Sequence, residues 1–264
     1  MRIIIPIKQV PETSNVKMDP EKGTMVREGV ESIINPLDLY SIEVGIRLKE
    51  EYGGEIIVVS MGPPKAQDAL KEAIAMGCDD AVLLTDRFFA GADTFATSYA
   101  LSKAIEKLKP IDLVICGERA TDGDTAQVGP GLAALLGLPL STFTSKIVLE
   151  DGHVKATRLI EGGYEVLELP MPALITVVKE ISDPRLPTLR GKQNAKKLDI
   201  KKWSAQDIEA DTTKLGLKGS PTRVVKTFNP KVAREGKIIE VKDEKTLSLA
   251  VDEIIDLLKE KAAI

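Results

Sequence analysis

Short apolar runs that alternate with amphipathic helical segments are the feature that most constrains the fold of this 264-residue chain. The runs are aliphatic or β-branched, which is typical of buried parallel strands. They span Arg2–Lys8, Glu55–Ser60, Ala81–Thr85 and Leu113–Cys116. Between them, apolar residues recur at the spacing of one helical face. Strands joined by helices predict right-handed crossovers, and therefore an α/β fold with a parallel sheet flanked by helices.

The ends of the predicted helices carry their own signals. Asn35 precedes Pro36, which predicts a capping side chain followed by a proline at the first helical position. Gly77 is expected to end the second helix, and Pro110 follows the third. The polar segment Val16–Val30 instead predicts a small hairpin that turns within Asp19–Gly23.

The residues after Pro139 follow a different pattern. Phe143–Leu149, Val154–Ile160 and Tyr164–Leu169 read as strands separated by Asp-Gly and Gly-Gly dipeptides, which are hairpin signals. Ala173–Val178 is expected to be a further buried strand. An antiparallel extension is therefore predicted to join the parallel sheet.

Periodicity is lost beyond Ser182, so we divide the chain into three parts. Residues 1–182 are expected to form the α/β domain, with its antiparallel strands starting at about residue 140. Residues 183–203 contain seven basic residues and one acid between Arg185 and Lys202, which fits either a docking loop or a solvated basic stretch. Residues 204–264 are expected to form an extended arm and a terminal helix, about Asp243–Ala262, that contact a partner subunit.

Charge and composition exclude several classes of protein. The net charge is −4, so nucleic acid is not an expected partner, because its binding needs a basic surface. Two distant cysteines, Cys78 and Cys116, indicate a reducing compartment. The first apolar run is too short for a signal peptide or a membrane span. We therefore expect a cytoplasmic protein without a membrane span.

Catalytic side chains are not expected. The single histidine, His153, lies beside a predicted turn, where a solvated side chain is the simplest interpretation. Without a second histidine, neither a histidine-based triad nor a zinc cluster is predicted. Cys116 ends a buried strand and is interpreted as a core residue rather than a nucleophile. We therefore predict no metal site and no catalytic residue.

The loop after the last parallel strand is the strongest candidate for a binding site. It follows the carboxyl end of a strand and opens a helix, so backbone N–H groups and the positive helix end suit a nucleotide diphosphate. An Asp-Gly-Asp turn that only caps the helix is the alternative. The candidate cofactor-binding residues here are Gly117, Ala120, Asp122, Gly123, Asp124, Thr125, Ala126, Gln127, Val128 and Gly129.

Other strand ends are expected at the same edge of the sheet. Pro6 and Lys8 end the first strand, Asn35 and Asp38 lie at the start of the first helix, and Met61 ends the second strand. They complete the set of candidate cofactor-binding residues. The later match to G-x-G-x-x-A at residues 129–134 contains a proline and precedes hairpins, so we regard it as accidental.

Several motifs in order along the chain resemble the beta subunits of electron transfer flavoproteins. They are Ile5-Pro6-Ile7-Lys8-Gln9-Val10-Pro11, Ile34-Asn35-Pro36, Val59-Ser60-Met61-Gly62-Pro63, Ala73-Ile74-Ala75-Met76-Gly77, the Asp122-Gly123-Asp124-Thr125 loop and Asp183-Pro184-Arg185. The resemblance covers nearly the whole chain. It implies an adenine-nucleotide-hydrolase-like or flavodoxin-like domain that forms a heterodimer with an alpha subunit.

The resemblance also implies a cofactor and partners. Simple family members hold AMP in the beta subunit, but the loop at residues 122–130 looks like the electron-bifurcating branch, in which this subunit holds FAD near an NADH site. The favoured expectation is FAD, with AMP in a simple electron carrier as the alternative. Expected partners are dehydrogenases, docked through Leu186, Leu189 and Arg190, and ferredoxin- or flavodoxin-type acceptors. A stand-alone nucleotide-binding module of the stress-protein type and a scaffold with an empty crevice are the remaining alternatives.

Overall fold

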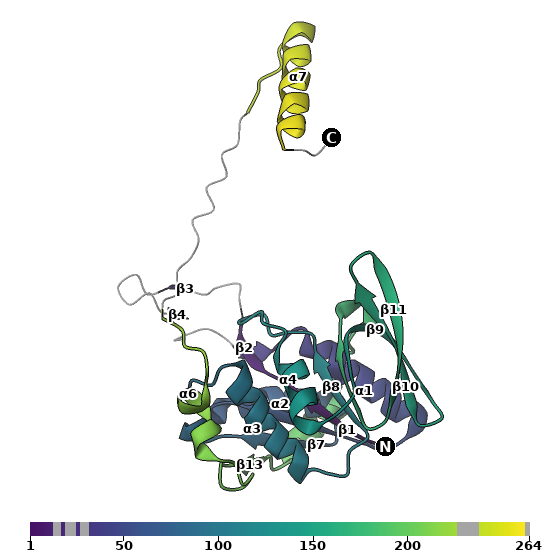
Figure 1. Ribbon diagram of the computed structural model, residues 1–264, viewed down its shortest axis with the longest axis vertical. Helices are drawn as coiled ribbons and strands as arrows, with labels where there is room; N and C mark the ends of the chain where they lie inside the picture. Colours follow the sequence, from purple (N-terminus) through teal and green to yellow (C-terminus); the bar gives the residue numbers. More distant parts are fainter. Residues whose placement is uncertain (13–16, 19–24, 27–31, 226–237, 262–264) are drawn as a thin grey trace. The chain divides into compact units, whose positions relative to one another are not determined.

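The computed structural model describes residues 1–12, 17–18, 25–26, 32–225 and 238–261 (Figure 1). The chain divides into two compact units, Met1–Lys226 and Thr227–Ile264. The larger unit contains the predicted α/β fold. Its boundary lies beyond the expected one at residue 182.

A single sheet of nine strands organises the larger unit. The strand order is β11-β10-β9-β12-β8-β1-β6-β7-β13. All neighbouring strands are parallel in the part of this order that runs from β9 to β13. The strands are β1 Arg2–Pro6, β6 Glu55–Met61, β7 Asp80–Leu84, β8 Leu113–Gly117, β9 Leu140–Glu150, β10 His153–Ile160, β11 Gly163–Pro170, β12 Ala173–Val177 and β13 Lys201–Trp203.

Helices cover both faces of this sheet. The longer ones are α1 Asp38–Tyr52, α2 Gln67–Met76, α3 Thr94–Lys107, α4 Val128–Leu136 and α5 Leu189–Lys197. Shorter ones are η2 Pro64–Ala66, η3 Arg87–Phe89, η4 Lys179–Ile181, η5 Thr212–Lys214 and α6 Gly216–Gly219. Helices α1, α2 and α5 contribute to one core, whereas α3 and α4 lie together over the other face (Figure 1).

Alternation along each strand produces the two cores. In β1, Ile3 and Ile5 face the core formed with α1 and α2, whereas Ile4 faces the core formed with α3 and α4. The same alternation holds for β8 and β12, whose residues are buried on both faces. Burial on both sides explains why these strands read as continuous apolar runs.

The antiparallel extension is confirmed. Strand β10 pairs antiparallel with both β9 and β11, and β9 pairs parallel with β12. The two tight turns lie at the predicted dipeptides, with Asp151, Gly152 and Gly162 all at positive φ. The hairpin predicted between residues 16 and 30 is also present as β3 Lys17–Met18 paired with β4 Met25–Val26, although its turn lies outside the described residues. The short strands β2 Gln9–Pro11 and β5 Ser32–Ile34 form a further antiparallel pair.

Residues 183–225 are more ordered than the lack of periodicity suggests. They contain α5, and β13 adds to the edge of the sheet beside β7. Helix α5 is strongly polar and buries only Ala195, while β13 has three residues. Elements this short and polar carry no hydrophobic period, so their order depends on tertiary contacts that a local pattern does not encode.

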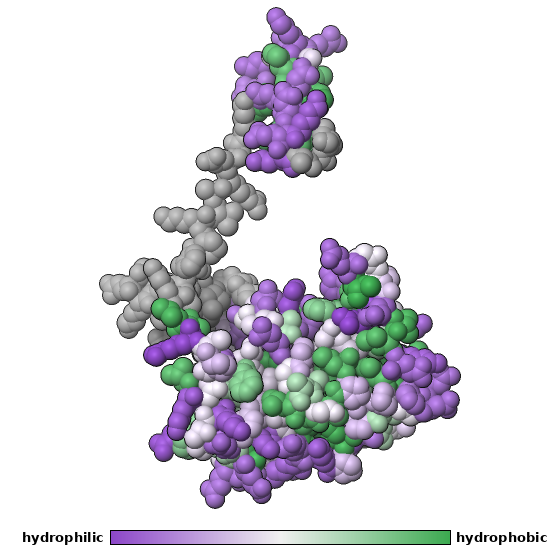
Figure 2. All heavy atoms as spheres, viewed as in Figure 1, coloured by the Kyte–Doolittle hydropathy of each residue, from purple (hydrophilic) through white to green (hydrophobic). Residues whose placement is uncertain are grey.

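The smaller unit contains α7, Glu244–Glu260, close to the predicted terminal helix. Asp243 accepts the N–H of Thr246, and the Thr246 hydroxyl accepts the N–H of Asp243, which forms a capping box. Both hydrophilic and hydrophobic side chains are exposed on this helix (Figure 2). Among the helices that the structure describes, none has the length and apolar character needed to cross a membrane.

Replacement of Leu132 by alanine tests whether α4 is anchored to the sheet. Leu132 is fully buried against the α3–α4 face, so the variant should lose about 2–5 kcal/mol of unfolding free energy. Leu135 in the same helix is 39% exposed, so Leu135→Ala should cost less than about 1 kcal/mol. Urea unfolding followed by circular dichroism measures both, and equal losses would contradict the assignment of the buried face.

Candidate functional site

The expected crevice is the edge of the sheet where the chain leaves two adjacent strands in opposite directions. Strands β1 and β8 are parallel neighbours at the centre of the sheet. Helix α1, the first helix after β1, covers one face, and α4, which follows β8, covers the other. Ligands of open α/β sheets bind at such a switch point, outside the carboxyl ends of the strands. The loop of residues 118–127 lies at this position.

A close backbone contact closes the floor of the crevice. Gly117, the last residue of β8, lies against the start of α1: a Cβ there would overlap a carboxylate oxygen of Asp38 and lie 2.8 Å from the carbonyl oxygen of Leu37. Only glycine permits this separation. The sequence predicted Gly117 as a cofactor contact, and the structure gives it a packing role at the same place.

Asn35 has a different role from the predicted helix cap. Helix α1 begins at Asp38, and no side chain caps it. The Asn35 side chain, fully buried, instead donates to the carbonyl of Arg119 at 2.9 Å and accepts the N–H of Thr121 at 3.1 Å. The cap prediction was wrong because residues 35–37 form a turn before the helix. Asn35 therefore fixes the candidate loop to the β1 side of the crevice.

Asp38 is a buried carboxyl in the wall of the crevice. It accepts the backbone N–H of Lys8 at 2.7 Å. Burial raises the pKa of Asp38 from 3.8 to about 7, against the opposing effects of the Lys8 N–H, the Asn35 side chain and the Lys8 charge, while the charge of Asp122 adds to the rise. Near neutral pH, this group can therefore hold a proton inside the crevice.

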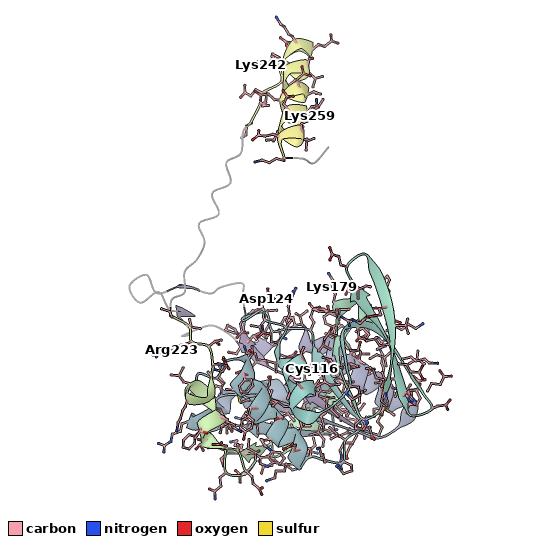
Figure 3. All side chains as sticks on the ribbon, in the orientation of Figure 1. Cys116, Asp124, Lys179, Arg223, Lys242 and Lys259 are labelled. Atoms are coloured by element: carbon pink, nitrogen blue, oxygen red, sulfur yellow. The ribbon has the colours of Figure 1, made fainter. Side chains whose placement is uncertain are left out.

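Two ion pairs neutralise the carboxylates of the loop. The ammonium of Lys8 lies 2.6 Å from Asp122, and the guanidinium of Arg119 lies 3.0 Å from Asp124. Asp124 lies at the surface of the unit, whereas Cys116 lies deeper within it (Figure 3). The repulsion that these two aspartates would exert on a phosphate is thereby reduced.

The loop backbone is held in an uncommon conformation. Asp124 and Ala126 both have a φ of 53°, although neither is glycine. The carbonyl of Ala120 accepts the N–H groups of Gly123 and Asp124, which closes the first turn of the loop. Left-handed non-glycine residues are concentrated at ligand-binding segments of proteins. A Cβ at Gly123 would meet nothing within 4 Å, so the loop backbone there is open to a ligand.

Backbone N–H groups without partners follow this turn. Within the described part of the chain, no acceptor is present for the N–H groups of five consecutive residues, Thr125, Ala126, Gln127, Val128 and Gly129. They lead into α4, whose start receives no side-chain cap. Unpaired amides at a helix N-terminus bind anions through hydrogen bonds and the helix dipole.

The start of α4 is packed tightly against its neighbours. Gly129 lies against Thr176 of β12, and Gly131 lies against Ser98 of α3, where a Cβ would approach to 2.5 and 2.6 Å. The side chain of Gln127 accepts a hydrogen bond from the Thr94 hydroxyl at 2.9 Å. The glycines of the G-x-G-x-x-A match therefore serve helix packing, consistent with our interpretation of that match as accidental.

The remaining predicted residues divide between the crevice edge and a separate surface. Pro6 and Met61 end β1 and β6 on the same edge of the sheet as Lys8. Leu186, Leu189 and Arg190 are exposed and lie on the segment that packs against α1 and α2 instead. Sequence reasoning missed the contributions of Arg119 and Thr121, because each acts through a partner that is distant in the sequence.

The cysteines and the histidine are not placed for catalysis. Both thiols are buried, and burial raises the pKa of Cys116 and raises that of Cys78 to about 12. His153 bonds the carbonyl of Asp151 in its own turn at 3.0 Å. Across the described ranges, no group of three or more His, Cys, Asp or Glu residues is arranged to hold a metal ion.

Known proteins are similar to this chain over most of its length. The profile of the family described as "Electron transfer flavoprotein domain" matches residues 22–208. A protein of Thermoanaerobacterium thermosaccharolyticum named electron transfer flavoprotein subunit beta is 51% identical over 90% of this chain and 92% of its own length. Subunit CarD of the caffeyl-CoA reductase-Etf complex of Acetobacterium woodii is 44% identical over the full length of both chains. Protein FixA of Azotobacter vinelandii is 42% identical over 95% of this chain and 92% of its own.

Alanine at Gly117 tests the contact at the crevice floor. The added Cβ must displace Asp38 and the Leu37 carbonyl, so Gly117→Ala should lower the unfolding free energy by about 1–3 kcal/mol. Gly123→Ala is the matched control in the same loop and should stay within about 0.5 kcal/mol of the parent protein. Chemical denaturation measures both, and a Gly117→Ala variant as stable as the control would refute a tight contact.

The pH dependence of stability tests the burial of Asp38. Its carboxyl ionises readily in the unfolded chain but resists ionisation in the folded one, so its contribution to stability is fully present below about pH 4 and is lost as the pH rises to about 7. Unfolding free energies measured from pH 4 to pH 8 should therefore fall relative to Asp38→Asn, by an amount on the order of 4 kcal/mol. The exposed Asp68→Asn variant should follow the parent protein, and a constant difference between parent and Asp38→Asn would contradict the raised pKa.

Proposed function

Because this chain belongs to the electron transfer flavoprotein family as a beta subunit, we propose that its crevice binds FAD and that it transfers electrons as a heterodimer with an alpha subunit. The proposal assigns the diphosphate of FAD to the loop between β8 and α4. It assigns no catalytic step to a side chain, because the cofactor supplies the redox chemistry.

The unpaired N–H groups of residues 125–129 are the observation that carries this proposal. They are consecutive, lie at a switch point of the sheet and open a helix of nine residues. A diphosphate presents several acceptor oxygens, which is the complement that such a row of donors requires. The open space at Gly123 allows the backbone to approach the ligand closely.

The charges around the loop are compatible with an anionic ligand. Asp122 and Asp124 are already paired, with Lys8 and Arg119 respectively. Both cations are about half exposed, so they can reorient toward a phosphate while remaining near their carboxylates. The carboxyl of Asp38 adds little negative charge when it is protonated, which also favours an anion in the crevice.

We further propose NADH as the electron donor and two separate acceptors, as in flavin-based electron bifurcation. When bound, FAD supplies two-electron uptake and one-electron release. One acceptor class is a ferredoxin or flavodoxin. The other is a flavin-dependent acyl-CoA dehydrogenase or reductase, by analogy with the relative whose name includes a caffeyl-CoA reductase-Etf complex.

The terminal helix supports an association with the alpha subunit. The exposed apolar side chains on one face of α7 include Leu247, Val251, Ile254 and Leu258, at the spacing of adjacent helical turns. An apolar helix face of this kind is stabilised when a partner covers it. We assign the alpha subunit as that partner, and we assign Leu186, Leu189 and Arg190 to the docking of the dehydrogenase.

Nucleotide analysis of the purified heterodimer tests the assignment of FAD. Denaturation should release two FAD molecules per heterodimer, one from each subunit, as quantified by chromatography and flavin absorbance. One FAD and one AMP would instead identify a simple electron carrier with a structural nucleotide. An isolated monomer that keeps its nucleotide would favour the stand-alone module.

Two variants at Ala126 test whether the loop binds the nucleotide, one as the disruptive change and the other as its control. Valine is β-branched and is strongly disfavoured at a φ of 53°, so Ala126→Val should release the nucleotide of this subunit while the far-ultraviolet circular dichroism stays unchanged. Glycine accepts this conformation, so Ala126→Gly should keep the nucleotide. Full nucleotide content in Ala126→Val would rule out the loop as the binding element.

A further inference from the structure

The segment from Asp183 to Leu189 is fixed at both of its ends. Its two exposed leucines, Leu186 and Leu189, are 85% and 83% accessible to solvent. Exposed leucines on an unsupported loop would sample many positions and would lose that freedom on binding. The contacts on either side of these leucines decide whether the surface that they form exists before a partner binds.

The first anchor is a network around Arg185. Its side chain donates to Glu43 at 2.8 and 3.1 Å and to Glu50 at 2.5 and 2.9 Å, and its backbone N–H donates to Glu43 at 3.1 Å. Both carboxylates belong to α1. Two carboxylates that each receive two side-chain donors define the orientation of a planar guanidinium, which lysine cannot reproduce.

Glu43 is the buried carboxylate of this network, and its ionisation depends on arginine. The Glu43 side chain is only 2% exposed. Burial opposes its ionisation, but the hydrogen bonds from Arg185 and from Arg47, the latter at 2.7 Å, outweigh burial and lower the pKa of Glu43. Glu43 is therefore a charged group inside the unit, and Arg185 is its partner from the docking segment.

The second anchor is the carbonyl oxygen of Ala75 near the end of α2. It accepts the N–H of Thr188 at 3.3 Å. Gly191 also lies against it so closely that a Cβ at Gly191 would overlap it. The Thr188 hydroxyl accepts the N–H of Gly191 at 2.9 Å and so caps α5. The chain is thereby fixed immediately before and after Leu189.

The residues between the anchors have little conformational freedom. Pro184 and Pro187 fix φ on either side of Arg185 and Leu186. Leu186 lies between Arg185 and Thr188, and Leu189 begins α5. The side chains of the two leucines make the exposed surface, while the backbone beneath them is held by α1 and α2.

We propose that Arg185 is a positioning residue for partner docking: its clamp on Glu43 and Glu50 holds Leu186 and Leu189 in their binding positions before the partner arrives. This inference rests on the proposed docking function of the segment. Basic residues follow Leu189 in the first turn of α5, at Arg190 and Lys192. The surface therefore fits a partner with an apolar pocket rimmed by carboxylates.

The first measurement needs no partner. In the intact heterodimer, hydrogen exchange of the Thr188 amide reports whether the segment stays closed on Ala75. Arg185→Gln should accelerate this exchange roughly tenfold. Glu50→Gln removes only the exposed half of the clamp, leaves Glu43 paired and should give a smaller acceleration. Unchanged exchange in both variants would overturn the proposal.

The second measurement uses electron exchange with a flavin-dependent acyl-CoA dehydrogenase as the heterodimer concentration is varied. Arg185→Gln should raise KM about fivefold with kcat unchanged, and Arg185→Lys should restore part of the loss. Lys196→Gln removes the same charge from exposed α5 and should change KM less. A normal KM in Arg185→Gln, with KM raised in Leu189→Ala, would refute the clamp.

Two outcomes separate this inference from the docking proposal. A normal KM in Leu189→Ala would refute docking through this segment, whereas the exchange of the Thr188 amide would still test the clamp. If Arg185→Gln unfolds because the buried Glu43 loses one of its two arginine partners, the paired variant Glu43→Gln with Arg185→Gln removes the buried charge. Accelerated exchange and a raised KM in that folded pair would support the positioning role, and parent-like values would overturn it.

Discussion

The approach of Gly117 to the first turn of α1 is the contact on which the crevice depends. It brings the end of β8 within van der Waals distance of Leu37 and Asp38. Because β8 and β1 are neighbours, the same contact places the loop after β8 opposite Lys8 and Asn35. A bulkier residue at 117 would separate the two sides of the crevice. The hydrogen bonds of Asn35 to the loop and the ion pair of Lys8 with Asp122 both require the two sides to stay close.

The loop combines fixed geometry with compensated charge. Its strained residues, Asp124 and Ala126, persist because the Asn35 bridge, the Ala120 turn and the packing of α4 determine the path of the backbone around them. Among the residues that carry the unpaired N–H groups, Thr125 and Gln127 are exposed and only Gly129 is buried, so the cost of burying unpaired donors is limited. Such a site is organised before any ligand arrives, which favours binding.

The sequence predicted the parts of the fold that have a strong local signal. The central strands are buried on both faces, so their apolar runs identified them, and the turn dipeptides located the antiparallel hairpins. Asn35 was misassigned because Asn-Pro is equally suited to a cap and to the turn that is present. The hydrogen bonds and ion pairs of Arg119 and Arg185 could not be predicted, although Arg185 was noted as part of a motif, since their partners depend on the tertiary fold. Helix α5 and strand β13 were missed for the same reason, because tertiary contacts rather than an amphipathic period stabilise them.

Helix α1 links the two surfaces of the larger unit for which we propose functions. Its first residue, Asp38, forms part of the crevice wall, while Glu43 and Glu50 hold Arg185 of the docking segment. An α-helix rises about 1.5 Å per residue and resists stretching, so the separation along α1 between these groups is fixed. Ala75 of α2 and the core beneath both helices restrain the same segment from the other side. A partner that docks on the leucines would therefore meet the crevice at a defined distance, which the sheet and α1 maintain together.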